Sequence, residues 1–273
     1  MRRARGTAVA AALLLAGCTA AQLGQLGDNL PSLEGLGRIG QQALPIAADR
    51  ERAIGFGIAA TVAGRYPLVQ DEALTRYVSL VGQAVAQQSV RAGEVEFHFA
   101  VLDTDDVNAF AAPGGYVFLT RGALALMETE AELAGVLAHE VGHVDQKHVI
   151  EAIRRSSIFE QARDETQLQG ALLDRLSEVG TTLLFTGLSR EEELEADSLG
   201  VLYAGATGYR PDGLRGFLRR LHAAEGAAAG SSLREWIATH PSTAERIQVA
   251  ERQLTGTSPT GADGAARFRA SVR

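Results

Sequence analysis

The residues with the clearest chemical potential form one short run, His139-Glu140-Val141-Gly142-His143, which is an HExxH pattern. On a helix, residues four apart lie on the same face, so the imidazoles of His139 and His143 can reach one metal ion. Glu140 lies about 100° round the helix from His139 and can take a proton from a metal-bound water. The pattern therefore predicts a metal ion with a carboxylate base beside it.

The residues around this pattern bear on whether it is a functional site. The alternative is a solvated helix face that carries two histidines by chance. Against it, the apolar residues Leu133, Val136 and Leu137 predict a helix that is buried on much of its circumference. Buried imidazole and carboxylate groups need partners, and a metal ion provides one.

A third metal ligand is needed, because catalytic zinc usually takes three protein ligands and one water. His148 lies nine residues beyond His139, close to 180° away on a continuous helix, so we do not expect it to bind. In the acidic run over 189–197, Glu193 and Asp197 are four apart. The first can be a ligand, and the second can accept a hydrogen bond from the Nδ1–H of a ligand histidine. The remaining acidic residues are expected to point elsewhere: Glu191, Glu192 and Glu195. By itself, such a run is more often a solvated helix start, where the helix dipole favours Glu.

The composition sets broad limits on the class of protein. The chain has 273 residues, 46% hydrophobic and 22% charged, which is typical of one globular domain with tethers. Its single cysteine, Cys18, excludes an intramolecular disulfide and a cysteine-based zinc ribbon. The net charge of −7 argues against a nucleic-acid partner, which would require a basic patch.

The N-terminal segment has the pattern of a secretory signal. Arginines at positions 2, 3 and 5 precede an apolar stretch over 6–16 that is too short to span a bilayer. Leu15-Ala16-Gly17-Cys18 resembles the lipobox of bacterial lipoproteins, which implies cleavage after residue 17 and acylation of Cys18. Thr19 then favours the outer membrane, and lipid is expected to be the sole membrane attachment. A plain signal peptide with an incidental cysteine is the alternative.

The pattern of apolar and turn-forming residues divides the rest of the chain. Residues 18–47 are expected to be a lipidated tether, 48–255 the folded domain and 256–273 a flexible tail. Alternation of apolar residues predicts strands over 95–102 and 116–120, with a turn at Pro113-Gly114-Gly115 before the second. Helical spacing predicts helices over 49–65, 71–88, 128–155, 158–178, 190–206, 211–225 and 242–254.

Four motifs in order resemble the HtpX-type family of gluzincin zinc peptidases, over residues 50–255. They are Asn108-Ala-Phe-Ala-x-Pro-Gly-Gly115, HExxH, Ser189-Arg-x-x-Glu-x-Glu-Ala-Asp197 and His240-Pro-x-x-x-x-Arg246. The resemblance implies an α+β, mostly helical, zincin-like domain with a small sheet beside the HExxH helix. It also implies one Zn²⁺ per chain, bound by His139, His143 and Glu193, with Glu140 as the general base. Unlike membrane-embedded members, the chain shows no transmembrane helix pattern, and unlike a related member it is expected to have no C-terminal helical-repeat domain.

Three further roles rest on this resemblance. If the strand at 116–120 is an edge strand, it can bind an extended peptide; the alternative is an ordinary core strand. His240 is either a local hydrogen-bond partner in a capping turn or, as in a related member, a ligand at the fourth zinc position in the resting enzyme. Arg246 could position the segment that carries His240 or stabilise the oxyanion of the reaction.

Together these features predict a zinc-dependent endopeptidase, anchored by lipid on the periplasmic side of the cell envelope, at the outer membrane. Its expected substrates are unfolded, misfolded or unassembled envelope proteins. A non-hydrolytic, chaperone-like assembly factor for outer-membrane proteins is the rival function. An iron oxygenase with two histidines and one carboxylate is disfavoured, because it has no need of a base between its histidines. The sequence leaves the oligomeric state open.

Overall fold

The helix that carries the HExxH pattern, α6 (Glu130–Asp145), is buried along its entire length. We describe it from a computed structural model that covers residues 46–272, apart from 162–169, 227–232, 241–242 and 256–259. The predicted signal segment, Cys18 and nearly all of the predicted tether lie outside the described residues. The side chain of Thr129 caps the start of α6 by accepting a hydrogen bond from the backbone N–H of Glu132.

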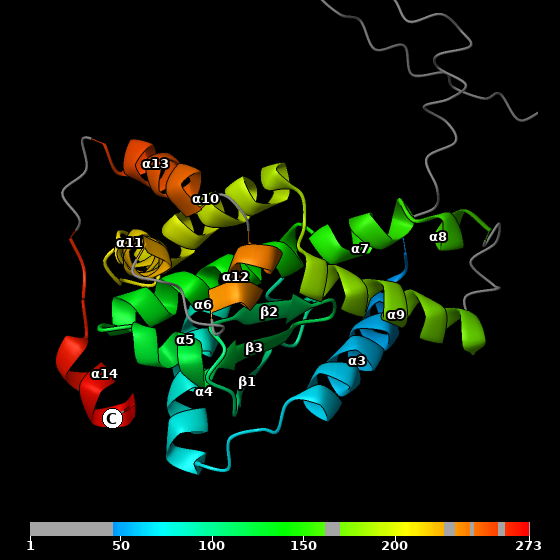
Figure 1. Ribbon diagram of the computed structural model, residues 1–273, viewed down its shortest axis with the longest axis horizontal. Helices are drawn as coiled ribbons and strands as arrows, with labels where there is room; N and C mark the ends of the chain where they lie inside the picture. The colour runs from blue at the N-terminus through cyan, green and yellow to red at the C-terminus, as the bar shows by residue number, and fades with distance from the viewer. Residues whose placement is uncertain (1–45, 162–169, 227–232, 241–242, 256–259, 273) are drawn as a thin grey trace, which may run out of the picture. The chain divides into compact units, whose positions relative to one another are not determined.

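A three-stranded mixed sheet lies beside this helix (Figure 1). Its order is β1-β3-β2, with β1 (His98–Leu102) parallel and β2 (Ala109–Ala112) antiparallel to β3 (Tyr116–Thr120). β2 and β3 form a hairpin whose turn contains Gly114 and Gly115, both with positive φ. β3 is therefore the central strand, so of the two alternatives left open for 116–120 the structure shows the core strand and not the edge strand. Because β2 is a short, fully buried run rich in alanine, it shows no alternation and the sequence did not predict it.

Helices cover both faces of the sheet. Phe99 and Val101 of β1 point into a core with α4 (Glu72–Ala86) and α6, whereas Leu102 points into a second core. That second core includes apolar residues of α3 (Ala48–Arg65) and α9 (Ala171–Thr186). On the other side of α6 lie α10 (Arg190–Ala206) and α11 (Gly213–Gly226), both packed on α13 (Thr243–Leu254). The mostly helical α+β fold is confirmed.

Two of the expected helices differ from the structure. The helix predicted over 128–155 is broken at Lys147, whose φ of 57° ends α6 and starts α7 (His148–Arg154). The helix predicted over 158–178 is replaced by a short α8 (Ser157–Gln161) and by α9. Apolar spacing continues through such breaks, so periodicity alone does not reveal them. Within the described ranges, no helix has the length and apolarity needed to cross a bilayer.

The C-terminal segment is folded where we expected a flexible tail. Residues 265–272 form α14 (Ala265–Val272), and the side chain of Phe268 is fully buried beside Tyr77 of α4. Arg267 of α14 donates to both carboxylate oxygens of buried Glu130, at the start of α6. Glu130 also accepts hydrogen bonds from Tyr77 (2.8 Å) and Tyr209 (2.6 Å). Because its partners come from distant parts of the chain, short-range patterning could not reveal this contact.

The buried ring of Phe268 makes α14 part of the folded domain. We expect Phe268→Ala to lower the free energy of unfolding by about 3 kcal/mol or more, because it leaves a cavity between α14 and α4. Arg269→Ala, at an exposed position of the same helix, is the matched control and should change stability by less than about 0.5 kcal/mol. Urea denaturation measures both, and equal stabilities would show that α14 is not docked.

Candidate metal centre

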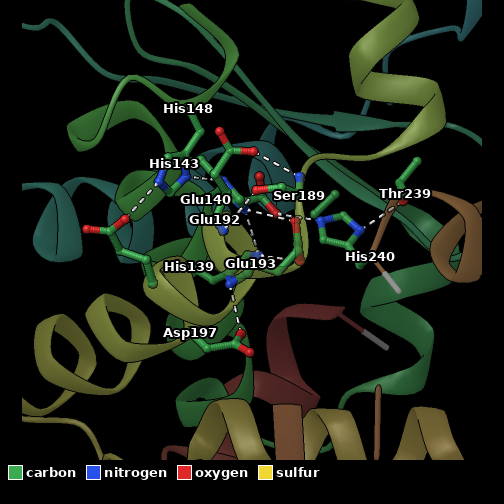
Figure 2. A network of polar contacts seen from close by, with 12 residues as sticks. His139, Glu140, His143, His148, Ser189, Glu192, Glu193, Asp197, Thr239 and His240 are labelled. Atoms are coloured by element: carbon green, nitrogen blue, oxygen red, sulfur yellow. Dashed lines mark hydrogen bonds and ion pairs between the residues drawn. The ribbon is translucent and has the colours of Figure 1, made fainter. Parts of the chain in front are cut away.

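Four buried side chains from three segments converge at the middle of α6. The metal-binding atoms of His139, His143, Glu193 and His240 all lie within 4.8 Å of one another. The Nε2 atoms of His139 and His143 are 3.0 Å apart, and Glu193 Oε1 is 3.4 Å from His143 Nε2. Figure 2 shows these groups facing a common point, with Asp197 and Thr239 on the outer sides of His139 and His240. The structure thus brings together the three predicted ligands and His240.

Small residues let the two helices that carry these groups approach closely. A Cβ added to Gly142 of α6 would lie 3.1 Å from Leu199 Cβ, and one added to Gly200 of α10 would lie 3.3 Å from the backbone N of His139. Ser189 and Glu192 form a capping box that starts α10 immediately before Glu193. Glu192 therefore points away from the cluster, as expected, and pairs with Arg155 at 2.7 Å.

Asp197 and Arg246 support the cluster from behind. Asp197 Oδ1 is 3.0 Å from His139 Nδ1, so the Nδ1–H of His139 donates to it and the Nε2 lone pair faces the cluster. Arg246 donates to both oxygens of Asp197, at 2.7 and 2.8 Å, and its Nη1 is 3.2 Å from Glu193 Oε2. The buried guanidinium thus orients two carboxylates, an arrangement that the sequence had not indicated for Arg246.

Burial sets the protonation of these groups in the absence of a cation. Burial, together with the charge of Arg246, lowers the pKa of His139 to about 4. Burial raises the pKa of Glu193 to about 8 although Arg246 opposes the shift, and burial and the charge of Glu193 raise the pKa of Glu140. For Asp197, burial acts to raise the pKa, but the charge and hydrogen bonds of Arg246 outweigh it and the pKa falls.

The donor set fits a zinc ion. Glu140 Oε1 is buried and accepts no hydrogen bond from the described residues, whereas the buried Glu193 Oε2 is met by the ion pair with Arg246. An oxygen such as Glu140 Oε1 is costly to bury unless a cation or a water satisfies it. Two imidazoles and one carboxylate, with a further position open to water, are the typical ligands of catalytic zinc. The cluster is therefore consistent with a zinc site.

His240 is held at the edge of the cluster by Trp236 and Thr239. Its ring stacks on Trp236 with the centroids 4.3 Å apart, and its Nδ1 is 2.8 Å from Thr239 Oγ1. Thr239 in turn contacts Asn108 Oδ1 at 3.1 Å, which links this loop to the start of β2. His240 Nε2 lies 3.8 Å from Glu140 Oε1. His240 is therefore both a local hydrogen-bond partner and close enough to share the site.

A narrow cavity leads to Glu140 and His143. Its volume is about 20 Å³, which is space for one water molecule. Phe110 of β2 and Leu183 and Leu184 of α9 contribute to its apolar walls. Apart from the Asn108 motif, no signal in the sequence had linked β2 or α9 to the site.

His148 is the residue that the sequence prediction misplaced. Because α6 ends at Asp145 and Lys147 turns the chain, the ring of His148 reaches the back of His143, with their Nδ1 atoms 2.8 Å apart. Its Nε2 lies 3.4 Å from Oε2 of Glu195, which we had expected to point elsewhere. A left-handed conformation at a lysine is uncommon and has no sequence signature, so the sequence alone could not find this contact.

Comparison with known proteins agrees with the geometry. The sequence profile of "Peptidase family M48" matches residues 72–254. The chain belongs to peptidase family M48. This M48 metalloendopeptidase is 28% identical over 262 residues to the "Beta-barrel assembly-enhancing protease" of Escherichia coli (strain K12), covering 91% of the present chain and 52% of that protein. The protein of the same name from Yersinia pestis is 29% identical, and the match covers 84% of the present chain and 49% of that protein. The "Mitochondrial metalloendopeptidase OMA1" of Schizosaccharomyces pombe is 34% identical, and the match covers 66% of the present chain and 53% of that protein. The M48 peptidase thus spans about half the length of these curated relatives.

The cluster predicts which side chains of this M48 peptidase govern metal content. We expect one zinc per chain, lost or strongly weakened in His139→Ala, His143→Ala and Glu193→Ala. Asp197→Ala should weaken zinc binding by about 10–100-fold, since it removes only the support of His139. Atomic absorption and chelator competition measure this, with the exposed His222→Ala as control. Full zinc occupancy in Glu193→Ala would contradict the ligand assignment.

Proposed function

We propose that this M48 peptidase is a zinc-dependent endopeptidase that degrades misfolded or unassembled proteins of the bacterial cell envelope. The observation that carries the proposal is the buried cluster of His139, His143 and Glu193 with the unsatisfied carboxylate of Glu140 beside it. The names of the two bacterial relatives, which refer to β-barrel assembly, support an envelope substrate. Acylation of Cys18 would place the enzyme on the periplasmic side of the outer membrane.

The chain's own groups account for the proton transfers of peptide hydrolysis. A zinc ion bound by His139, His143 and Glu193 would supply a Lewis acid that polarises the peptide carbonyl and makes water more acidic. Glu140 accepts a proton from the attacking water and delivers it to the leaving amine. Burial favours this role, because it raises the proton affinity of the carboxylate and excludes competing water. Asp197 and Arg246 keep His139 and Glu193 in place during these transfers.

The strand β2 would provide a binding edge for the substrate once the side chains that bury it move aside. One of its edges pairs with β3, and within the described residues no strand pairs with the other. Ala109, Phe110 and Ala111 of β2 line the cavity beside Glu140. An extended peptide that adds to this edge is recognised mainly through its backbone, which selects unfolded segments over particular side chains. The peptide-binding role that we considered for 116–120 is therefore proposed for β2.

His240 controls access to this site. Because its Nε2 lies within 4.8 Å of the three predicted ligands, a neutral His240 can occupy the position that water needs. The cavity beside Glu140 has a volume of about 20 Å³ and is lined by His240, so in this role the His240 side chain moves aside when substrate binds. Arg246 stays engaged with Asp197 and Glu193 and anchors the segment that carries His240.

A non-hydrolytic assembly factor is the second candidate. The narrow cavity and the word "assembly-enhancing" in the names of the bacterial relatives favour it. Such a factor would hold unfolded outer-membrane proteins without cleaving them. Both candidates bind zinc, so only hydrolysis separates them.

Removing the base tests the proposed function directly. Glu140→Gln should retain zinc but cleave an unfolded test protein about 10²–10⁴-fold more slowly, because the side-chain amide cannot accept the proton. Cleavage is followed by gel electrophoresis, and zinc is measured on the same sample. Glu128→Gln, an exposed position before α6, is the control. If wild type and Glu140→Gln are equally inactive while both bind unfolded outer-membrane protein, the assembly factor is the better description.

The proposed role of His240, which is to occupy the position that water needs, predicts a rise in the rate of hydrolysis when His240 is removed. We expect His240→Ala to hydrolyse the same unfolded protein faster than the wild type, because the variant frees the position beside Glu140 without removing a predicted ligand. Zinc content should stay the same. A slower variant with full zinc would mean that His240 stabilises the transition state instead.

A further inference from the structure

The residue between α6 and α7, Lys147, has a strained backbone conformation. Lys147 has φ 57° and ψ 31°, and it is the one non-glycine residue with positive φ in the part of the chain that the structure describes. Such a conformation persists only where the surroundings impose it, and it often marks a functional position.

Buried polar groups on two sides impose this turn. Arg91 pairs with both oxygens of Glu51 of α3, at 2.8 and 2.9 Å, and donates to the carbonyl oxygen of Val144 at 2.8 Å. Lys147 Nζ is 3.2 Å from the same Glu51 carboxylate. These contacts hold the last turn of α6 and the side chain of Lys147 to one carboxylate, so the chain direction after α6 is fixed.

Asp145 secures the other side of the turn. Its carboxylate accepts hydrogen bonds from the hydroxyls of Ser89 and Tyr203, the latter at 2.7 Å, and from the backbone N–H of Val90. Asp145 is the last residue of α6, so this network fixes the end of the helix relative to α10.

The consequence of the turn is a contact between two imidazoles. On a continuous helix, five residues would place His148 about 140° away from His143. Instead, their Nδ1 atoms lie 2.8 Å apart, with the ring planes at 73° (Figure 2). His148 is 4% exposed, and its Nε2 is directed at the partly exposed carboxylate of Glu195, 3.4 Å away.

One arrangement of protons satisfies this chain of contacts. Nε2 of His143 faces Glu193 and His139, so it must carry a lone pair if it is to bind a cation. The proton of His143 then lies on Nδ1, which donates to the Nδ1 lone pair of His148. His148 in turn carries its proton on Nε2, which faces Glu195. Each imidazole is thus held in the tautomer that the next group requires.

We propose that His148 is a positioning residue that fixes the ring orientation and tautomer of His143, and that Glu195 orients His148. His148 thereby serves His143 as Asp197 serves His139. The strained turn at Lys147 places His148 against His143. This inference rests on the proposed function, since it assumes that His143 binds zinc.

The test compares two variants of similar size at position 148. His148→Leu removes the acceptor for His143 Nδ1–H, and its zinc dissociation constant should rise by about 10–100-fold. In His148→Asn, the side-chain oxygen can take the place of Nδ1 as acceptor, so most of the affinity should return. Chelator competition gives the constants, and the visible spectrum of the cobalt(II)-loaded protein reports the ligand geometry. The spectrum should change in His148→Leu and be close to wild type in His148→Asn.

A purely structural role for His148 predicts a different result. The inference is overturned if the leucine and asparagine variants lose zinc affinity equally, or if neither loses any. Should His148→Leu fail to fold, Glu195→Ala carries the test, because its side chain is 54% exposed. It should weaken zinc binding, whereas Glu191→Ala, on the same helix and 77% exposed, should not; equal affinities would overturn the inference. A wild-type chain that bound no zinc would instead refute the proposed function.

Discussion

Burial of charge is the constraint on which the rest of the structure depends. The two facing helices α6 and α10 enclose imidazoles and carboxylates that are almost inaccessible to water. Removing such groups from water costs several kcal/mol each unless partners replace the lost hydration. Arg246 supplies one part of this compensation, because a single guanidinium contacts both Asp197 and Glu193. The unsatisfied oxygen of Glu140 leaves the other part open, which a water or a divalent cation can supply.

The same constraint explains why the site is assembled from distant segments. α6 can offer only one face to the metal, so the third predicted ligand has to come from α10. Glycines at the α6–α10 interface permit the approach, and the capping box at Ser189 sets where α10 begins. β2, α9, Thr239 and His240 line the remaining sides of a cavity whose volume is about that of one water.

Support for the two histidines of the motif differs in kind. His139 is backed by a buried carboxylate that is itself held by an arginine, so its orientation depends on the domain interior. His143 is backed by an imidazole whose outer partner is partly exposed. These contacts therefore connect His139 to the core of the domain and His143 to its surface. Variation at the surface can then tune the site without unfolding the core.

The sequence by itself determined the local features of this protein. The HExxH spacing, the pair Glu193 and Asp197, and the helix over 190–206 follow from helical periodicity and from the chemistry of the side chains, which act over a few residues. The tertiary structure alone decided the central position of β3, the docking of α14, the grip of Arg246 on two carboxylates and the contact of His148 with His143. Each of these depends on partners far apart in the chain or on a strained turn that distant residues impose. Local patterning carries no information about such contacts, because their free energy arises only when the whole domain has packed.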